Sequence, residues 1–334
     1  MKPFDHNGPG LPGSLFGLPV MLEEAQLVVL PIPWDVTVSY QDGTSQAPQH
    51  ILQASRQLDL YHPRIKEAWK LKAAMAPIPQ NLLSENQITR SLAVKHVQAL
   101  DESASDPTVL ASKINEASEN LNIYVKKLSQ QYLKVGKMVG LVGGDHSTPL
   151  GLLRALAEKY DRFGILQIDA HADLRKAYEG FTYSHGSIMY NALRLPAIAR
   201  LIQVGVRDYC EEEVNVMQRG MGRIKTFFDD EVKRSLLEGE TWKSWCNKII
   251  KELPPLVYIS FDIDGLDPKL CPHTGTPVPG GLELHHVTYL LDELKNSGKK
   301  IIGFDLCEVG PGEWDANVGA RILWELCHYT MATR

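Results

Sequence analysis

Three short segments of the chain carry closely spaced aspartate and histidine residues, which are side chains that bind divalent cations. The segments are GGDHS (143–147), DAHADLR (169–175) and DIDGLDP (262–268). If their carboxylates converge, each pair repels by about 4 kcal/mol at about 4 Å and an effective dielectric of about 20. Two divalent cations cancel four negative charges, so the pattern predicts a two-metal site. The candidate metal ligands are His146, Asp169, His171, Asp173, Asp262 and Asp264.

The ligand types also indicate which metal would bind. Carboxylates and imidazoles without a thiolate favour Mn²⁺ over structural zinc, with Ni²⁺, Co²⁺ and Fe²⁺ as alternatives. Each segment alone has an ordinary explanation as a tight turn or a helix-capping network, because aspartate is common in turns. The occurrence of all three after apolar runs favours the metal site over three unrelated turns.

Each of these segments follows an apolar run that predicts a β-strand. Helical patterns separate many of the runs, which is typical of a mostly parallel sheet with helices on both faces. The carboxyl ends of parallel strands share one edge of the sheet, so the three polar segments should meet there. The predicted strands are 27–32, 137–143, 163–168, 201–206, 256–263 and 300–306, with weaker candidates at 73–78 and 224–228.

Helical signals lie between the predicted strands. Ser147 is the expected N-cap of a helix that continues through LGLLRALAEKY, and Asp106 with Pro107 is the expected start of a second, long amphipathic helix. Residues 79–105 show no clear pattern. The apolar stripe of the long helix consists of Val109, Leu110, Ile114, Leu121, Val125 and Leu128.

The composition is that of a globular protein of 334 residues, with 44% hydrophobic and 22% charged residues. We expect a Pro- and Gly-rich N-terminal arm (1–26) and a single catalytic domain (27–334). The net charge of -5 argues against nucleic-acid and anionic-membrane partners. No run reaches the roughly 18 apolar residues of a membrane span, so a cytoplasmic protein is expected. The five scattered cysteines are expected to be reduced packing residues.

The three metal-ligand segments resemble, in the same order, the signature motifs of the ureohydrolase family, which contains arginases and agmatinases. Weaker likeness lies in PIPWDVTVSYQDGTSQAP, SHGS, IQVGVRD, GTPVPGG and EVGP. The resemblance implies a three-layer α/β/α fold with a mostly parallel sheet of about eight strands, a binuclear manganese centre and a trimeric or hexameric homo-oligomer. It assigns His146, Asp169, Asp173 and Asp262 to one ion and His171, Asp169, Asp262 and Asp264 to the other, with Asp169 and Asp262 bridging.

The chemistry that this family carries out is hydrolysis of a guanidino group to urea and an amine. By family likeness Asp264 supplies a proton to the leaving amine, His185 shuttles protons and Glu308 pairs with the guanidinium. Without the likeness, His185 could be a loop histidine and Glu308 a surface carboxylate. Asp145 and Asp267 are expected to orient ligands. Surface or packing roles are expected for His50, His96, His273, His285 and His286. Packing roles are expected for Trp34 and Trp314, with the mouth of the pocket as the alternative.

The loop LRKAYEGFTYSHG bears on the substrate. It lacks the Asn and Ser pattern with which arginases read an amino-acid head group, which favours agmatine, cleaved to putrescine and urea. Arg175 would suit a carboxylated substrate and Glu179 the ammonium of agmatine. The alternatives are guanidinobutyrate, guanidinopropionate, free guanidine or arginine. A formimidoylglutamase, a metal-dependent deacetylase and a metal-stabilised binding protein without activity are further alternatives.

Overall fold

The computed structural model describes residues 4–102, 108–220 and 222–334, and these form one sheet flanked by helices. Every neighbouring pair of strands is parallel, in the order β2-β1-β3-β8-β7-β4-β5-β6. All eight predicted strands are confirmed, including the two weaker candidates. The strands are β1 (Leu27–Pro31), β2 (Ala73–Met75), β3 (Met138–Val142), β4 (Phe163–Ile168), β5 (Ile198–Val204), β6 (Ile224–Phe227), β7 (Leu256–Asp262) and β8 (Lys300–Cys307).

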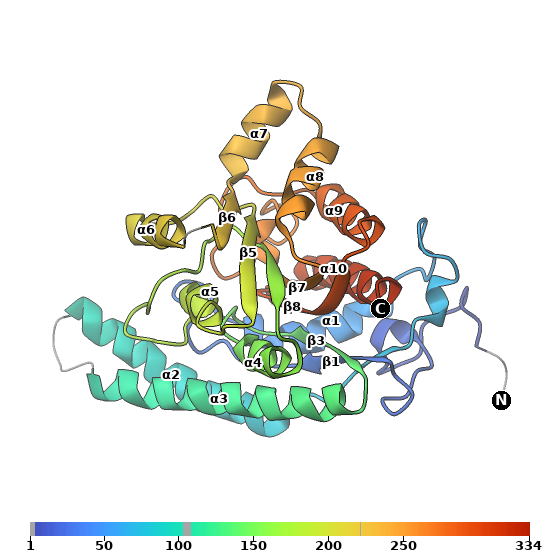
Figure 1. Cartoon of the computed structure of the whole chain (residues 1–334). Helices are drawn as coiled ribbons and strands as arrows, with labels where there is room; N and C mark the ends of the chain where they lie inside the picture. The colour runs from blue at the N-terminus through green and yellow to red at the C-terminus, as the bar shows by residue number, and fades with distance from the viewer. Residues whose placement is uncertain (1–3, 103–107, 221) are drawn as a thin grey trace.

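Helices cover both faces of the sheet, which confirms the three-layer α/β/α architecture (Figure 1). One apolar core lies between the sheet and α1 (Ala47–Ser55), α8 (Trp242–Glu252), α9 (Leu284–Asn296) and α10 (Glu313–Ala332). The other lies under α2 (Gln80–Glu102), α3 (Thr108–Lys134), α4 (Leu150–Lys159) and α5 (Ile188–Ala192). The remaining elements are α6 (Glu211–Arg219), α7 (Asp229–Leu237) and the 3-10 turns η1 (Leu15–Gly17), η2 (Thr44–Gln46), η3 (Ala68–Lys70), η4 (His185–Ser187) and η5 (Ile263–Gly265).

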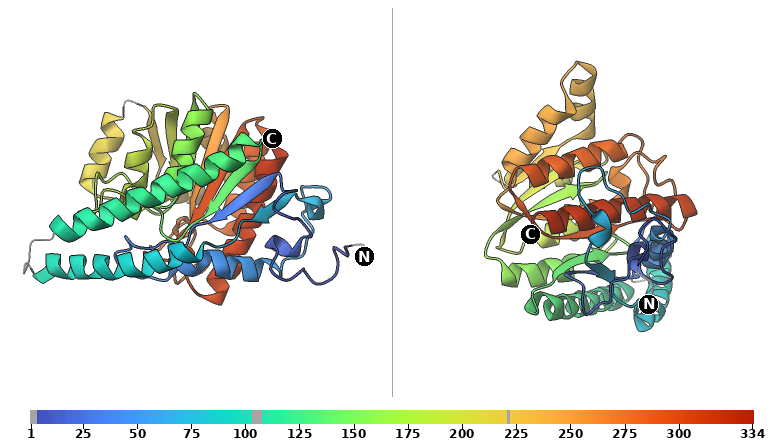
Figure 2. Two further views of the ribbon diagram at one scale, coloured as in Figure 1. Left: turned by 90° about the horizontal axis from the view of Figure 1, so that it is seen from below. Right: turned by 90° about the vertical axis from the view of Figure 1, so that its right-hand side faces the viewer.

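Two helix predictions need correction. Ser147 is not an N-cap, because α4 begins at Leu150 with Pro149 at the cap position, and the Ser147 hydroxyl donates to Asp145 instead. Helix α2 fills most of the segment in which no pattern was recognised, and it lies beside α3 (Figure 2).

The long amphipathic helix that the sequence predicts is α3, with its apolar stripe facing the core in part. Ile114, Leu121 and Val125 are buried, whereas Val109 is exposed. The predicted helix start at Asp106 and Pro107 lies outside the described residues.

The N-terminal segment packs against the body of the protein. Phe16 is fully buried, its backbone N–H donates to Ser55 Oγ at 3.0 Å, and its ring meets Trp324 edge to face at 4.9 Å. These contacts fix the segment to α1 and α10. None of the helices in the described part of the chain has the length and apolarity needed to cross a membrane.

The cysteines and His96 take the expected packing positions, and His273 takes a surface position. All five cysteines are free, and four of them are buried. His96 is buried, whereas His273 is exposed and bonds to Asp315 through Nδ1. Trp34 is also buried, but the packing prediction fails for Trp314, which is 53% exposed and donates its indole N–H to the Lys269 carbonyl.

Candidate metal centre

The three polar segments follow β3, β4 and β7 and meet at the carboxyl edge of the sheet. Two groups of side chains there have ligand atoms that all lie within 4.8 Å of one another. Asp169 belongs to both groups, which is the arrangement that a bridging carboxylate requires. The first group is His146, Asp169 and Asp262, and the second is Asp169, His171 and Asp264.

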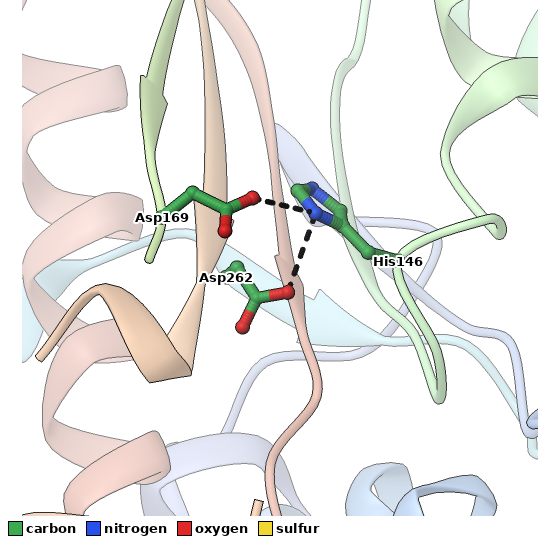
Figure 3. Close-up of side chains that lie close together, drawn as sticks. All are labelled: His146, Asp169 and Asp262. Atoms are coloured by element: carbon green, nitrogen blue, oxygen red, sulfur yellow. Dashed lines mark ion pairs between the residues drawn. The ribbon is translucent and has the colours of Figure 1, made fainter. Parts of the chain in front are cut away.

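One ring nitrogen of His146 faces the carboxylates of both Asp169 and Asp262 (Figure 3). Its Nδ1 is 3.1 Å from Asp169 Oδ2, 3.0 Å from Asp173 Oδ2 and 3.3 Å from Asp262 Oδ2. This buried nitrogen forms no hydrogen bond. A ring nitrogen surrounded by carboxylate oxygens, with no hydrogen-bond partner, fits a cation held between them.

The opposite side of the His146 ring is held by two residues that sequence analysis missed. Ser260 Oγ donates to Asp305 Oδ2 at 2.8 Å, and it lies 2.9 Å from His146 Nε2. Because the hydroxyl proton goes to Asp305, the Ser260 oxygen accepts the Nε2 proton, which leaves the Nδ1 lone pair facing the carboxylates. The sequence feature that could have identified Ser260 and Asp305 is the presence of a single polar residue within an otherwise apolar strand.

The second group forms between the loop after β4 and the turn η5. His171 Nδ1 lies 2.9 Å from Asp264 Oδ2 and 3.7 Å from Asp169 Oδ1. Asp264 is held in turn by the Ala170 N–H, which donates to its Oδ1, and by its own N–H, which donates to Asp262 Oδ1. The two loops therefore fix each other at the site.

A row of buried and half-buried polar side chains extends from Asp169 across β4, β5 and β6. The Thr226 hydroxyl donates to Gln203 Oε1, Gln203 Nε2 donates to Gln167 Oε1, and Gln167 Nε2 donates to Asp169 Oδ2, each at 2.7 Å. This row orients one carboxylate oxygen of Asp169 from within the sheet. Sequence analysis did not single out these residues.

The charges of the site fit a cation better than protons. Burial raises the pKa of Asp262 well above its usual range, and the nearby Asp264 and Asp169 charges raise it further. Burial and the Asp169 charge likewise raise the pKa of Asp173 to about 7. Burial lowers the pKa of His146, but its contacts with Asp169 and the other carboxylates outweigh this effect. Bound cations would replace the protons that this crowding otherwise requires.

The site opens into a cavity of about 460 Å³. Arg175 lies on its wall, 4.9 Å above the ring of Tyr178 and 4.0 Å from Glu213. Glu179 is not among the described residues that line the cavity, so the structure favours Arg175 over Glu179 as the charged residue beside a substrate. The lining consists of Ser39, Tyr40, Gln41, His171, Asp173, Arg175, Tyr178, His185, Gly186, Asp208, Tyr209, Glu213, Thr276, Pro277 and Val278.

His185 and Glu308 each present a buried atom without a hydrogen-bond partner, His185 Nδ1 and Glu308 Oε2. Burial and the His171 charge lower the pKa of His185 to about 4. The His146 N–H donates to Glu308 Oε1 at 2.9 Å, which ties this carboxylate to the metal-ligand loop. Burial, with the Asp145 charge, raises the pKa of Glu308 well above its usual range, so the ionised form of Glu308 needs a cationic partner. Glu308 is buried and is not among the described residues that line the cavity.

The two aspartates expected to orient ligands differ. Asp145 is buried beside His146 and accepts bonds from the N–H and hydroxyl of Thr37 at 3.0 and 2.8 Å, so it holds the metal-ligand loop. Asp267 contacts Lys269 instead, through a backbone N–H bond and an ion pair. The expectation is therefore wrong for Asp267, which reads as a turn residue.

The parallel sheet and the imidazole–carboxylate site at its carboxyl edge define the class as an α/β/α protein with a candidate binuclear metal centre. Comparison with known proteins gives the family. Residues 25–329 match the model of the arginase family, and the chain belongs to that family.

Curated relatives give the same result. The chain is 31% identical to the N(1)-aminopropylagmatine ureohydrolase of Thermus thermophilus over 90% of this chain and 88% of the relative. It is 28% identical to the agmatinase of Bacillus anthracis over 86% and 85%. The resemblance to ureohydrolases and the predicted enzyme class are confirmed.

Solved structures confirm the fold. The agmatine ureohydrolase of Thermoplasma volcanium superposes with a TM-score of 0.69 and 24% identity, covering 93% of this chain and 91% of that one. The arginase of Bacillus cereus superposes with a TM-score of 0.64 and 19% identity, covering 90% and 98%.

Proposed function

We propose that this protein hydrolyses the guanidino group of a small amine substrate to urea and an amine, with agmatine or an N-substituted agmatine as the substrate. The observation that carries the proposal is the pair of cation-binding groups that share Asp169 on the cavity side of the sheet. The names of the relatives, agmatinase and N(1)-aminopropylagmatine ureohydrolase, support a substrate with an amine tail.

Two divalent cations, when bound by the six aspartate and histidine side chains, would lower the pKa of a water molecule and polarise the guanidino group. We assign the ligands as the sequence predicts, with Asp169 and Asp262 shared between the ions. Manganese is the proposed metal, because the donors are oxygen and imidazole nitrogen.

The other residues of the site would bind substrate and move protons. Glu308 Oε2 accepts from a guanidinium N–H and orients the carbon for attack by water. The water oxygen adds to this carbon, and the bond from the carbon to the substituted nitrogen breaks. Asp264 takes a proton from the attacking water and returns it to the leaving amine, and His185 exchanges protons with the cavity through its free Nδ1.

A urea-release assay tests the proposal. Enzyme stripped of metal and reloaded with manganese or nickel is incubated with agmatine, N-aminopropylagmatine, arginine, guanidinobutyrate, guanidinopropionate and guanidine. We expect urea from an amine-tailed member of the panel, and the Asp169→Asn variant should lose metal and more than about 100-fold in rate. Release of acetate from acetylated amines without urea would favour a deacetylase, and metal occupancy without turnover would favour a binding protein.

Arg175 supports a guanidino acid such as guanidinobutyrate as the second candidate substrate, because a guanidinium binds carboxylates. Asp208, also on the cavity wall and 4.0 Å from His171 Nε2, would suit an ammonium tail. For an acid substrate, Arg175→Ala should lower kcat/KM by about tenfold or more while Asp208→Asn has little effect. The amine substrate predicts the reverse ranking.

Localisation in the cytoplasm, a role in polyamine biosynthesis, and a trimer or hexamer stay predictions. So does the division into the arm (1–26) and the catalytic domain (27–334).

A further inference from the structure

Two loops that form walls of the cavity are both bonded to the same pair of helices. Loop A (residues 33–43) contributes Ser39, Tyr40 and Gln41 to the lining, and loop B (residues 175–186) contributes Arg175, Tyr178, His185 and Gly186. Helices α2 and α3 lie side by side on the outer side of both loops (Figures 1 and 2). Among the described residues, neither helix contributes to the cavity lining.

Loop A is bonded to α2 by two buried or half-buried side chains. Asn86 Oδ1 accepts from the Asp35 N–H, and Asn86 Nδ2 donates to Asp35 Oδ1, both at 2.8 Å. Arg90 Nη1 donates to the carbonyls of Val36 and Val38 at 3.2 and 2.7 Å. Because these bonds reach Asp35, Val36 and Val38, loop A has little freedom to shift relative to α2.

Loop A in turn bonds directly to the reaction centre through Thr37. The Thr37 hydroxyl donates to Asp145, the neighbour of His146, at 2.8 Å and accepts from the His185 N–H at 3.1 Å. The position of Thr37 therefore affects both the metal-ligand loop and His185.

Loop B is bonded to the other part of the helix pair. His96 Nε2 on α2 donates to the Glu179 carbonyl at 2.7 Å. Asn115 on α3 donates to the Gly180 carbonyl at 3.0 Å and accepts from the Thr182 N–H at 2.8 Å. Backbone groups of Glu179, Gly180 and Thr182, at the tip of this loop, thus bond to α2 and α3.

These bonds hold a backbone conformation that the loop disfavours by itself. Glu179 and Gly180 have φ angles of 52° and 82°, and Tyr178 and Phe181 pair around them as in a tight hairpin turn. A non-glycine residue in this region costs about 1 kcal/mol or more and persists where its surroundings hold it. The turn directs Tyr178 against His185, with ring centroids 5.8 Å apart, and under Arg175.

We propose that the α2–α3 pair is a positioning element for the substrate cavity. Asn86 and Arg90 hold loop A, and His96 and Asn115 hold loop B, so that Tyr178, Arg175 and His185 keep the positions in which they meet a substrate. None of the four positioning residues lines the cavity or contributes a metal ligand. The effect on catalysis rests on the proposed function, whereas the effect on loop B does not.

The test compares His96→Ala with His96→Gln, in which the amide nitrogen can replace Nε2 as donor. Lys95→Ala is the matched control, because Lys95 is the exposed neighbour of His96 on the same helix. Four quantities are measured on metal-loaded protein: hydrogen exchange of residues 176–183, metal content, KM for urea release and kcat for urea release.

We expect His96→Ala to raise exchange in residues 176–183 by about tenfold, and KM by a similar factor, with metal content unchanged. His96→Gln should restore both values toward those of the parent, and Lys95→Ala should change neither. Unchanged exchange and KM in folded His96→Ala would overturn the proposal, as would equal effects of Ala and Gln. If no guanidino compound is hydrolysed but exchange responds as expected, the proposed function fails and the positioning of loop B stands.

Discussion

A single hydroxyl group determines which nitrogen of His146 faces the candidate metal site. The Ser260 oxygen accepts a hydrogen bond from Nε2–H because its own O–H donates to Asp305. The unprotonated Nδ1 is then left among three carboxylates. Without these two hydrogen bonds, the imidazole could take the other tautomer and present an N–H to a cation. Ser260 therefore fixes the tautomer of His146, and the tautomer decides whether Nδ1 can bind a cation.

Ser260→Ala should weaken metal binding by about 10- to 100-fold, because the His146 ring loses the partner that fixes its tautomer and orientation. Metal affinity measured by competition with a chelator checks this expectation, with urea release falling at limiting metal and recovering at high metal. Ser129→Ala is the control, since Ser129 is also buried and its hydroxyl bonds only to Val125 within α3 among the bonds described. Equal metal affinity in the Ser260→Ala and parent proteins would contradict the tautomer argument.

Sequence reasoning found the residues that face the cavity more readily than the residues behind them. Asp169 and His171 stand out because they follow an apolar run, where polar residues signal a strand end. Ser260 and Asp305 lie inside strands, and single polar residues there resemble ordinary variation until the fold brings them to His146. His96 and Asn115 act through backbone carbonyls of a distant loop, and no local pattern reveals such partners.

At the scale of elements, the site depends on how closely the loop after β4 approaches the turn η5. A Cβ atom at Gly265 would lie 2.6 Å from the Asp169 nitrogen and 2.9 Å from the Ile168 carbonyl carbon. Both neighbours are backbone atoms, which cannot rotate away as a flexible side chain could. The residue at position 265 must therefore be glycine for Asp169 and Asp264 to reach each other.

Gly265→Ala should destabilise the fold by about 1 to 3 kcal/mol and reduce metal content, because the two loops must separate to admit the methyl group. Chemical denaturation and metal analysis of the purified variant measure the two effects. Gly8→Ala serves as the control, since its nearest neighbour is the Asp5 side chain at 3.3 Å. A variant with parent-like stability and full metal content would show that the loops tolerate the change.

The strands could be predicted and one long helix could not, for a physical reason. Buried parallel strands such as β4 and β8 are apolar on both faces, so their sequences stand out as continuous runs. Helix α2 contacts α3 and the two cavity loops with polar as well as apolar side chains, and its amphipathic pattern is correspondingly weak. Its role in the fold follows from tertiary contacts that the local sequence does not encode.

The described part of the whole molecule has two apolar cores, one on each side of the sheet, and the N-terminal segment belongs to the core under α1, α8, α9 and α10. Phe16 and Leu15 belong to the core that α1 and α10 also form. A buried aromatic ring contributes more to the free energy of folding than a ring that stays exposed to solvent. The segment is therefore a structural part of the folded protein rather than a loose extension.

Phe16→Ala should lower the free energy of unfolding by about 3 to 5 kcal/mol, the usual cost of removing a buried phenylalanine ring. The measurement is the midpoint of urea unfolding, with metal content expected to match the parent because Phe16 lies in the α1 and α10 core. Leu11→Ala, at an exposed site on the same segment, should change stability by less than about 0.5 kcal/mol. Similar midpoints for the two variants would mean that the Phe16 ring contributes little to stability.

The hydrogen bonds in the row from Thr226 to Asp169 all point the same way, with each donor facing the next residue along. Each glutamine turns its oxygen toward β6 and its nitrogen toward the site, and reversing the Gln167 amide would set oxygen against oxygen at Asp169 and nitrogen against nitrogen at Gln203. The negative charge of Asp169 selects this orientation for every dipole in the row. The hydroxyl of Thr226, on the edge strand β6, is thus oriented through two glutamines by the ionised carboxylate of Asp169.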